Sequence, residues 1–396
     1  NFTLPLFPRD KRPEIIFAGN EVIANQVKDA LAKLVEVHIA PNIRPEIGHE
    51  NLAPAAEILN ETIMRIRARQ IGGFQSYQTI CTVPPVPTYH AFGRVVRFLS
   101  KINNPTKGVM GIDLGPSSLC VATAEKGNLH LSINTLGIDH EPSRLLNEIS
   151  ISDITRWTPG LLTDVQARDL IWQKSLQPGS TPATSETLAL EHALARELIT
   201  LGLKKHNQTY PQRRTFEPIL VSGQTFSRAT PGQSMMILLD SLQPQGVTTF
   251  IIDPYGIAPA IGAISNHNAL MPVQVIESNA FINLGTVITA ISKAKYGTPI
   301  LRVKVEYEIG EQVSIDVRQG VVTALPIQSG QSAQIHLQPL RPVEIYPGRK
   351  DETRSFKIVG GLCGVVIDTR GRPLILPSDT NRSRDVQKKW LAALGG

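Results

Sequence analysis

The apolar and polar positions in the first part of the chain predict alternating strands and helices. An apolar run at 14–18 ends at a Gly-Asn pair, and apolar residues then recur at helical spacing over 22–34. A second short apolar run covers 35–40, and a second helical pattern covers 52–69. The strand–helix–strand–helix order predicts α/β packing, in which helices cover a sheet.

A three-stranded unit is predicted at 107–136. Val109–Leu114 is apolar apart from Asp113, and two further strand patterns follow across short turns. The preceding segment, 70–106, is less regular and is predicted to be a linker with one helical pattern at 89–99.

A helix-rich region and two further strands are predicted next. Ser185 is expected to cap the start of a helix, and Trp157 and Trp172 are expected to pack in the core or against helices. The predicted elements are helices at 144–149, 163–174 and 185–205, a strand at 219–221, a helix at 234–242, a strand at 248–252 and a helix near 258–263.

Short strands dominate the last part of the chain. Residues 303–309 and 313–319 alternate apolar and polar side chains on either side of a Gly-containing turn, which predicts a hairpin. We therefore expect an all-β module, either a sandwich or a barrel. The strand candidates are 273–276, 280–291, 299–307, 312–317, 321–326 and 333–337.

The end of the chain is predicted to add a hairpin and a helix. Residues 365–368 and 374–376 are expected to pair across a turn in which Arg370 and Arg372 are solvated, and 384–394 is expected to form a closing helix. The patterns together predict three parts, which are 1–106, 107–271 and 272–396.

Composition narrows the class of protein. The 396 residues carry a formal net charge of +6, and 41% are hydrophobic, so we expect two or three domains with substantial cores. The basic residues are spread along the chain without interleaved aromatic residues, which argues against a nucleic-acid partner. No apolar run reaches the roughly 18 residues that a membrane span needs.

The cysteines and histidines point to no disulfide framework and no zinc motif. Cys81, Cys120 and Cys363 lie far apart, which is typical of a reducing compartment, and we expect a cytoplasmic protein. The nine histidines form no HExxH motif. The chain shows no signal peptide and does not begin with Met, so we expect a fragment, a split-gene product or a processed product.

The turn after Val109–Leu114 has the residue types of a phosphate site. A short turn at Gly115 allows backbone N–H groups to approach a phosphate, and the hydroxyls of Ser117 and Ser118 add donors. Asp113, at the strand end, is suited to hold Mg²⁺ through water. The alternative is an ordinary hairpin whose Gly and Ser residues only form the turn.

This hairpin resembles the phosphate-binding hairpins of actin-like ATPases, sugar kinases and DnaK-type chaperones. The later order of a strand ending in Ser222 and Gly223, a helix, a strand and a segment with Ala-x-Gly-Ala resembles the adenosine end of the actin-like fold. The resemblance implies that Gly223 lies against the adenosine of ATP, with Ser222 and Gln224 beside it.

Long collinear blocks over nearly the whole chain resemble the MutL proteins associated with glutamate mutase, which are unrelated to mismatch-repair MutL. The resemblance implies an actin-like ATPase (ribonuclease H-like) fold, ATP and Mg²⁺ as ligands, and a partner among cobamide-dependent mutases. The blocks are 13–20, 38–45, 91–100, 105–115, 217–253, 272–288 and 360–377.

Two departures from the family pattern weaken the expected nucleotide site. The family's first phosphate loop precedes the residues present here, so 1–106 resembles the tail of a first lobe that the full-length protein or another chain would supply. In the second loop, Pro116 lacks an N–H donor, Leu119 replaces a hydroxyl, and Cys120 replaces an acid.

We therefore expect an actin-like scaffold, or an assembly or reactivation factor, with a degenerate nucleotide site and a protein partner, not catalytic as this chain. One alternative is an ATP-hydrolysing reactivase of a cobamide-dependent mutase. Another is a structural subunit of a larger complex.

Overall fold

The computed structural model describes residues 3–48, 50–81, 85–103, 106–211, 215–265, 267–268, 270–308, 310–346, 349–350 and 353–395. The chain forms two compact units, Asn1–Thr88 and Tyr89–Gly396. The finer division at 106/107 and 271/272 stays a prediction.

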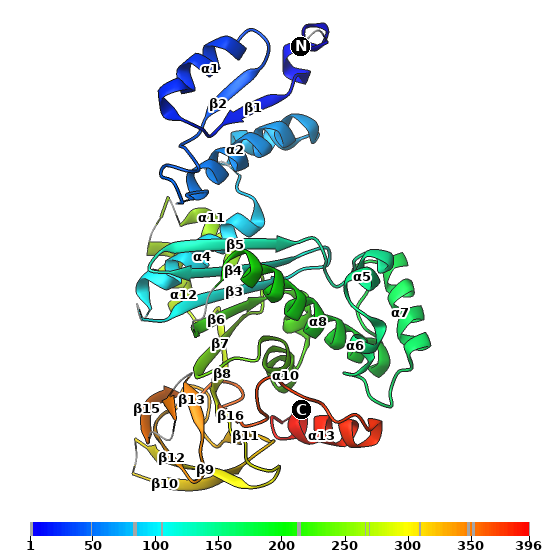
Figure 1. The fold of residues 1–396 in the computed structure, drawn as a ribbon, viewed down its shortest axis with the longest axis vertical. Coiled ribbons are helices and arrows are strands. Elements are labelled where there is room, and N and C mark those ends of the chain that lie inside the picture. The colour runs from blue at the N-terminus through cyan, green and yellow to red at the C-terminus, as the bar shows by residue number, and fades with distance from the viewer. Residues whose placement is uncertain are drawn as a thin grey trace. The chain divides into compact units, whose positions relative to one another are not determined.

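The first unit is a small α/β arrangement. β1 (Glu14–Phe17) pairs in parallel with β2 (Glu36–Ile39), and α1 (Ala24–Leu31) connects the two strands (Figure 1). α2 (Ala53–Gln70) follows β2, in the order expected from the sequence. α3 (Phe74–Ile80) was not expected, because its segment has no clear apolar period.

An eight-stranded mixed sheet lies at the centre of the second unit, in the order β11-β16-β8-β7-β6-β3-β4-β5 (Figure 1). β3, β6 and β7 are parallel neighbours, while β4 and β5 continue from β3 as an antiparallel meander. The strands are β3 (Gly108–Leu114), β4 (Leu119–Glu125), β5 (Asn128–Asn134), β6 (Phe216–Ser222), β7 (Val247–Asp253), β8 (Ile282–Thr289), β11 (Val322–Leu325) and β16 (Val365–Asp368).

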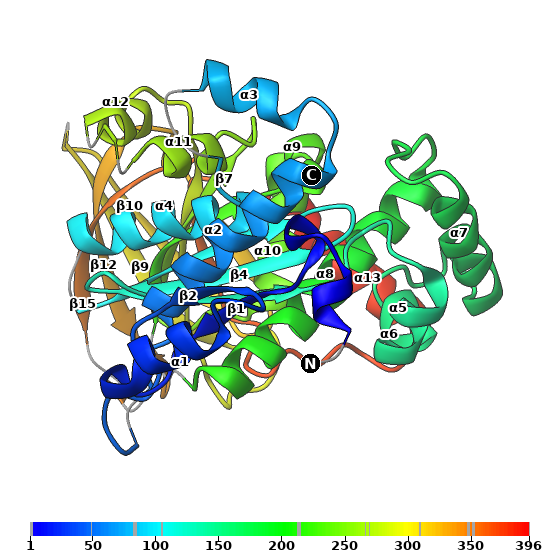
Figure 2. The same cartoon turned by 90° about the horizontal axis from the view of Figure 1, so that it is seen from above.

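Helices cover both faces of this sheet (Figure 2). Successive residues of a strand point to opposite faces, so the strands contribute side chains to an apolar core on each side. One core contains Phe92 of α4 (Thr88–Ile102) and Ala258 of α11 (Ala258–Ile264), packed with Val109 of β3. The other core contains Met110 of β3. It joins the sheet to α8 (Ser185–Thr209), α10 (Pro231–Leu242) and α13 (Thr380–Ala392).

The helical pattern expected within the 70–106 linker is therefore a core element. A β carbon placed on Gly111 would lie only 2.3 Å from Cγ2 of Val96, which shows how closely α4 packs on β3. Contacts of this kind join α4 to the second unit.

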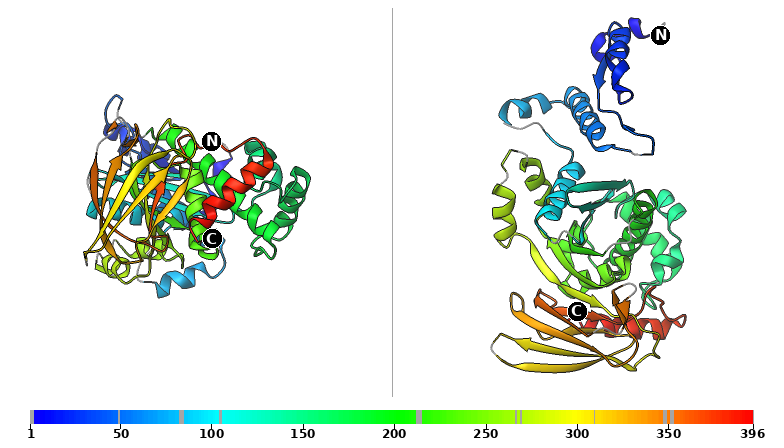
Figure 3. Two further views of the ribbon diagram at one scale, coloured as in Figure 1. Left: turned by 90° about the horizontal axis from the view of Figure 1, so that it is seen from below. Right: turned by 60° about the vertical axis from the view of Figure 1, so that its left-hand side comes forward.

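The C-terminal part forms a four-stranded antiparallel sheet with the order β10-β9-β12-β15 (Figure 3). A separate apolar core includes Val303 and Ile335. The mixed α/β sheet and the C-terminal antiparallel sheet confirm these two parts of the expected fold class. The strands are β9 (Pro299–Tyr307), β10 (Gln312–Arg318), β12 (Ser332–Pro339) and β15 (Arg354–Val359).

Four further helices belong to the connections between these elements. α5 (Pro142–Glu148), α6 (Ile151–Thr155) and α7 (Asp164–Leu176) lie between β5 and α8, and α12 (Leu270–Glu277) precedes β8. No helix among the described residues is long and apolar enough to cross a membrane.

Two strand predictions were wrong. Residues 273–276 lie in the helix α12, because a short apolar run does not distinguish a helix from a strand. Residues 374–376 form no strand. The backbone N–H of Leu374 donates instead to Oε1 of Gln243, at 2.7 Å.

Two side-chain predictions were also wrong. Trp172 is 47% exposed, whereas Trp157 packs against the core and donates its indole N–H to Glu197 at 2.6 Å. The cap of α8 is Thr184, not Ser185, and its hydroxyl accepts from the N–H of Thr187.

The arginines expected to be solvated at the last turn are buried ion-pair partners. Arg370 contacts Asp368 at 3.0 Å and Asp240 at 2.7 Å, and Arg372 contacts Asp368 at 2.8 Å. Asp240 is contacted from the other side by Arg196 at 2.8 Å. The carboxylate of Asp240 meets the guanidinium of Arg370 only when residues about 130 positions apart come together, and local sequence does not show this.

Candidate functional site

Three polar residues form a row at the carboxyl ends of neighbouring parallel strands. Asp113 is the next-to-last residue of β3, Ser222 is the last residue of β6, and Asp253 is the last residue of β7. The strand register pairs Asp113 with Ser222, and Ser222 with Asp253. In open α/β sheets, ligands bind at the carboxyl ends of the strands, so this edge is the candidate site.

Asp113 is partly buried, and its surroundings disfavour its charged form. Burial raises the pKa of Asp113, a hydrogen bond with Ser222 lowers it, and the nearby Asp253 raises it again. The net shift is upward. A bound cation would favour the carboxylate and reverse that shift.

Asp253 already has backbone partners at the start of α11. Its Oδ1 accepts from the N–H of Tyr255 at 3.3 Å and of Ile257 at 3.1 Å, and its Oδ2 accepts from the N–H of Ala258 at 2.7 Å. These bonds explain why a fully buried carboxylate is tolerated at this position. Asp253 therefore serves the strand-to-helix junction.

Cys120 lies directly across from Asp113 in the β3–β4 ladder. Its side chain is buried, and burial, with the charge of Asp113 as a smaller cause, strongly raises the pKa of its thiol. The thiol is neutral at physiological pH and is a poor acceptor for water bound to Mg²⁺. The residue opposite Asp113 thus adds no charge to the site.

The turn between β3 and β4 is closed by its own backbone and by the next loop. The N–H of Gly115 donates to the carbonyl of Ser118 at 2.9 Å. The N–H groups of Ile138 and Asp139 donate to the carbonyls of Gly115, at 3.2 Å, and Pro116, at 2.8 Å. A turn held in this way is compact and resists rearrangement.

The two serines of the turn have different environments. Ser118 is buried, and its hydroxyl makes a short hydrogen bond with the hydroxyl of Tyr89 on α4. Ser117 is exposed. Of the two hydroxyls expected to contact phosphate, only that of Ser117 lies at the surface.

Gly223 is required by the close approach of β6 to β3. Its φ is +126°, and a β carbon would lie 2.2 Å from the carbonyl oxygen of Leu114. Gln224 begins the short helix α9 (Gln224–Arg228), is exposed, and accepts from Arg228 at 3.1 Å. The packing of Gly223 has a structural reason that needs no ligand.

A very small cavity separates the turn from α9. Its volume is about 20 Å³, which is room for about one water molecule. The structure thus brings Gly115 and Gln224 to the walls of one cavity but leaves little space between them. Its walls include Gly115, Pro116, Asp139, Lys174, Gln224 and Arg228.

Buried charges that the sequence analysis did not anticipate line the same cavity. Lys174 contacts Asp139 at 2.9 Å and Glu191 at 3.3 Å, and the hydroxyl of Thr225 donates to Glu191 at 3.0 Å. The four residues come from separate elements and have no common motif. The local sequence therefore carried no signal for this group.

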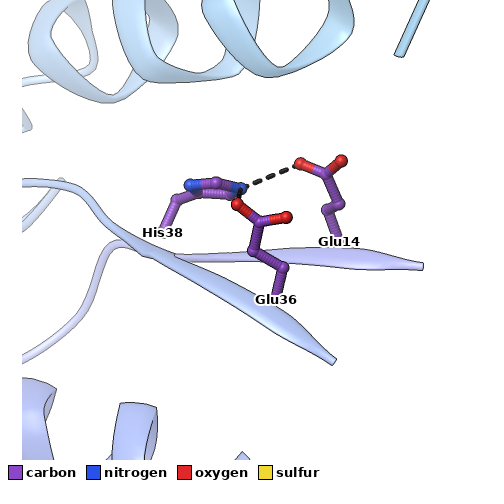
Figure 4. A group of neighbouring side chains, drawn as sticks. All are labelled: Glu14, Glu36 and His38. Atoms are coloured by element: carbon purple, nitrogen blue, oxygen red, sulfur yellow. Dashed lines mark hydrogen bonds and ion pairs between the residues drawn. The ribbon is translucent and has the colours of Figure 1, made fainter. Parts of the chain in front are cut away.

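A group that could hold a metal lies in the first unit. Glu14 on β1 and Glu36 and His38 on β2 point their ligand atoms toward one another (Figure 4), all within 4.8 Å. Arg65 contacts both carboxylates at 3.3 Å, and Arg69 contacts Glu14 at 3.3 Å. The guanidinium groups of α2 already balance these charges, so ion pairing of α2 with the strands accounts for the cluster.

Several solved structures resemble the chain loosely. One is the ethanolamine utilization protein EutJ from Carboxydothermus hydrogenoformans, with 14% identity over 61% of this chain and 71% of that chain and a TM-score of 0.29. Another is the activator of 2-hydroxyisocaproyl-CoA dehydratase from Clostridium difficile with bound ADPNP, with 15% identity over 48% and 68% and a TM-score of 0.27. An archaeal actin homolog has 12% identity over 44% and 54% and a TM-score of 0.26. At such TM-scores these likenesses carry no conclusion about ligand or activity.

Sequence comparison identifies the family of the chain. No curated protein matches the chain. The model of the family described as MutL protein matches residues 6–280, which is more than half of the chain. The matched region includes the β3–β4 turn and the β6–α9 junction. The chain belongs to the MutL protein family, the one associated with glutamate mutase.

Proposed function

We propose that this chain is an actin-like scaffold or assembly factor with a degenerate nucleotide site. The observation that carries the proposal is that the β3–β4 turn offers few free hydrogen-bond donors and little space for a phosphate. Pro116 has no N–H to donate, the hydroxyl of Ser118 bonds to Tyr89, and the adjoining cavity holds about 20 Å³. An ATPase needs donors and a metal around the transferred phosphate, and these residues do not fit a catalytic Mg·ATP.

The partner we propose is a protein, and family membership suggests its class. Cobamide-dependent carbon-skeleton mutases are the partners associated with this family, so we propose one of them. In this proposal the α/β sheet is a rigid frame, and the chain stabilises or assembles its partner without consuming ATP. A cytoplasmic location belongs to the same proposal.

A second candidate is an ATP-hydrolysing reactivase of the same partner. The observation that favours it is the row of Asp113, Ser222 and Asp253 at the ends of three parallel strands. Asp113 would then hold Mg²⁺ through water, Ser117 would contact phosphate, and Gly223 with Gln224 would lie near adenosine. Bound Mg·ATP would supply the phosphoryl group that is hydrolysed.

Calorimetric titration with Mg·ATP distinguishes the two candidates. The degenerate site predicts no saturable heat for the wild type and none for Asp113→Ala. Asp316→Ala is the matched control, because Asp316 is an exposed carboxylate on β10. Saturable heat that Asp113→Ala abolishes and Asp316→Ala leaves unchanged would contradict the degenerate site and favour the reactivase.

The partner is tested separately with a purified cobamide-dependent mutase from the same genome. Co-elution in size-exclusion chromatography, in the absence of nucleotide, is the expected result. Separate elution with and without Mg·ATP would contradict the proposed partner class.

A further inference from the structure

A larger cavity lies in the second unit, on a different face of α8 from the candidate site. Its volume is about 450 Å³, and it is bounded by α8, α10, α13 and the loop 157–161. Pockets for small organic ligands fall in the range of about 300–1,000 Å³. The cavity is therefore large enough for a small organic molecule.

Two adjacent residues of α8 show that the cavities are separate. Glu191 contacts Lys174 and Thr225 beside the β3–β4 turn. His192, the next residue, lines the large cavity. Neighbouring helix positions point about 100° apart, so one helix serves both places.

Much of the cavity wall is apolar or aromatic. Trp157 lies at one side and is stacked by the guanidinium groups of Arg156 and Arg196, at 5.0 and 5.2 Å from the ring centre. Such a wall suits a flat apolar ligand body. The large apolar lining residues are Trp157, Leu161, Leu188, Met236 and Leu391.

Two buried polar atoms in the wall make no hydrogen bond among the described residues. They are Nε2 of His192 and Nε of Arg384. His192 is only 8% exposed, and burial, reinforced by Arg196, lowers its pKa to about 4, so its imidazole is neutral at physiological pH. A buried polar atom without a hydrogen bond is costly, and a bound ligand would remove that cost.

The charge of the wall is positive. Arg196, Arg384 and Lys388 line the cavity, and Asp240 is its one acidic lining residue among those described. Asp240 is already contacted by Arg196 at 2.8 Å and by Arg370 at 2.7 Å. Within the cavity wall the cations of α13 thus have no acidic counterpart, and the acidic group near Arg384 is the exposed Asp385, 4.0 Å from its Nε and outside the wall.

We propose that this cavity binds a small organic anion with a flat apolar body. The anionic group would lie near Arg384 and Lys388, within reach of His192, and the body would pack against Trp157 and Met236. The proposal concerns a site separate from the strand-end row and does not depend on the proposed function.

The probe for the test is 8-anilinonaphthalene-1-sulfonate, an aromatic anion whose fluorescence rises on transfer to an apolar site. The comparison probe is N-phenyl-1-naphthylamine, which has the same rings without the sulfonate. We expect saturable binding of the sulfonate by the wild-type chain. Binding of the neutral probe should be at least about tenfold weaker, because the charged contacts are lost.

Two variants locate the binding. Arg384→Gln/Lys388→Gln should weaken the sulfonate about tenfold or more and leave the neutral probe unchanged. Ala189→Phe should weaken both probes, because Ala189 lines the cavity and a larger side chain fills it. Arg302→Gln/Lys357→Gln, on the exposed face of the antiparallel sheet, is the matched control and should change neither.

Unchanged near-ultraviolet circular dichroism and urea midpoints would show that the variants are folded. With folded variants, sulfonate binding that neither Arg384→Gln/Lys388→Gln nor Ala189→Phe weakens would overturn the proposal. Equal affinity for the two probes would overturn the anionic part of it. Displacement of the sulfonate by Mg·ATP that Asp113→Ala abolishes would assign the anion to the strand-end site instead.

Discussion

Individual side chains in this chain have environments that their neighbours in sequence do not indicate. Arg370 lies in a polar turn sequence, yet it is buried against Asp240 and Asp368, and its guanidinium stacks on Trp390 at 4.7 Å. Burial alone would raise the pKa of Asp368, but Arg370 and Arg372 outweigh it and hold that pKa well below its usual value. The cluster therefore depends on every member being present.

Arg370→Leu should destabilise the chain strongly. Removing the guanidinium takes one buried partner from each of Asp240 and Asp368, which then keep only Arg196 and Arg372, and breaking a buried pair costs about 3–5 kcal/mol. Urea denaturation gives the free energy of unfolding. Arg302→Leu is the control, because Arg302 pairs with Asp316 at the surface and should change little. Similar stabilities for the two variants would contradict the buried network.

His206 should make the folded state sensitive to acid. It is buried between Thr123 at 3.0 Å and Ser132 at 2.8 Å. Burial, with a smaller contribution from His130, lowers its pKa to about 4. A folded-state pKa below the ordinary 6.5 means that the unfolded chain binds more protons between these values. Stability is therefore complete above about pH 6.5 and falls as the pH drops toward 4.

The measurement for His206 is the free energy of unfolding in urea at several pH values. His206→Gln should lessen the decline between pH values near 6.5 and 4. His267→Gln, at an exposed position, should leave the decline as it is in the wild type. An equal decline in all three proteins would show that His206 does not cause the pH dependence.

At the scale of elements, junctions between strands and helices position the candidate sites. α8 presents Glu191 to one cavity and His192 to the other. The residue at which α8 starts and the way it packs therefore determine the walls of both cavities. The junction of β6 with α9 brings Gly223 against Leu114. These junctions are determined by single residues and can be tested one at a time.

Thr184→Ala should destabilise α8 more than Ser185→Ala. Thr184 accepts the N–H of Thr187 and forms a capping box with it, whereas Ser185 is the first residue of the helix. Loss of such a cap costs about 1 kcal/mol. Urea denaturation of the two variants is the measurement, and a larger effect of Ser185→Ala would restore the cap expected from the sequence.

Gly223→Ala should destabilise the chain whether or not nucleotide binds. The added carbon would meet the Leu114 carbonyl at 2.2 Å in a backbone conformation that favours glycine, a loss of about 3 kcal/mol or more. Gly310→Ala is the control, because its φ is also positive but nothing lies within 4 Å of the added carbon. It should lose only about 1 kcal/mol. Equal thermal midpoints would contradict the close approach.

At the scale of the whole molecule, the three main apolar cores all belong to the second unit. The core residues on α4 belong to one of them, together with Val109 and Ala258. Among the described residues of the first unit, the buried apolar side chains are few, and they are Ala24, Val35, Val37, Ala40 and Ala68. We therefore expect the second unit to fold by itself.

A fragment of residues 87–396 should be monodisperse and unfold cooperatively. A fragment of 107–396 should not, because it lacks α4 and exposes the sheet face that Phe92 and Val96 cover. Circular dichroism melting and size-exclusion chromatography of the two fragments are the measurements. A cooperatively folded 107–396 would contradict the structural role of α4 and favour the boundary at 106/107.

The sequence by itself determined the elements with a clear period and the family. The meander at 107–136, the hairpin of β9 with β10, and the long helix α8 all lie close to their expected positions. Each depends on the spacing of neighbouring residues, which sequence displays directly. The 273–276 segment failed because its apolar run is too short to show a period.

Only the tertiary structure decided which residues share a site. The parallel register of β3, β6 and β7 aligns Asp113 with Ser222 and Asp253, and α4 brings Tyr89 to Ser118. The large cavity likewise needs α8, α10 and α13 together. Such groupings depend on contacts between segments far apart in the chain, and the energies of burial and ion pairing that favour them have no local period in the sequence.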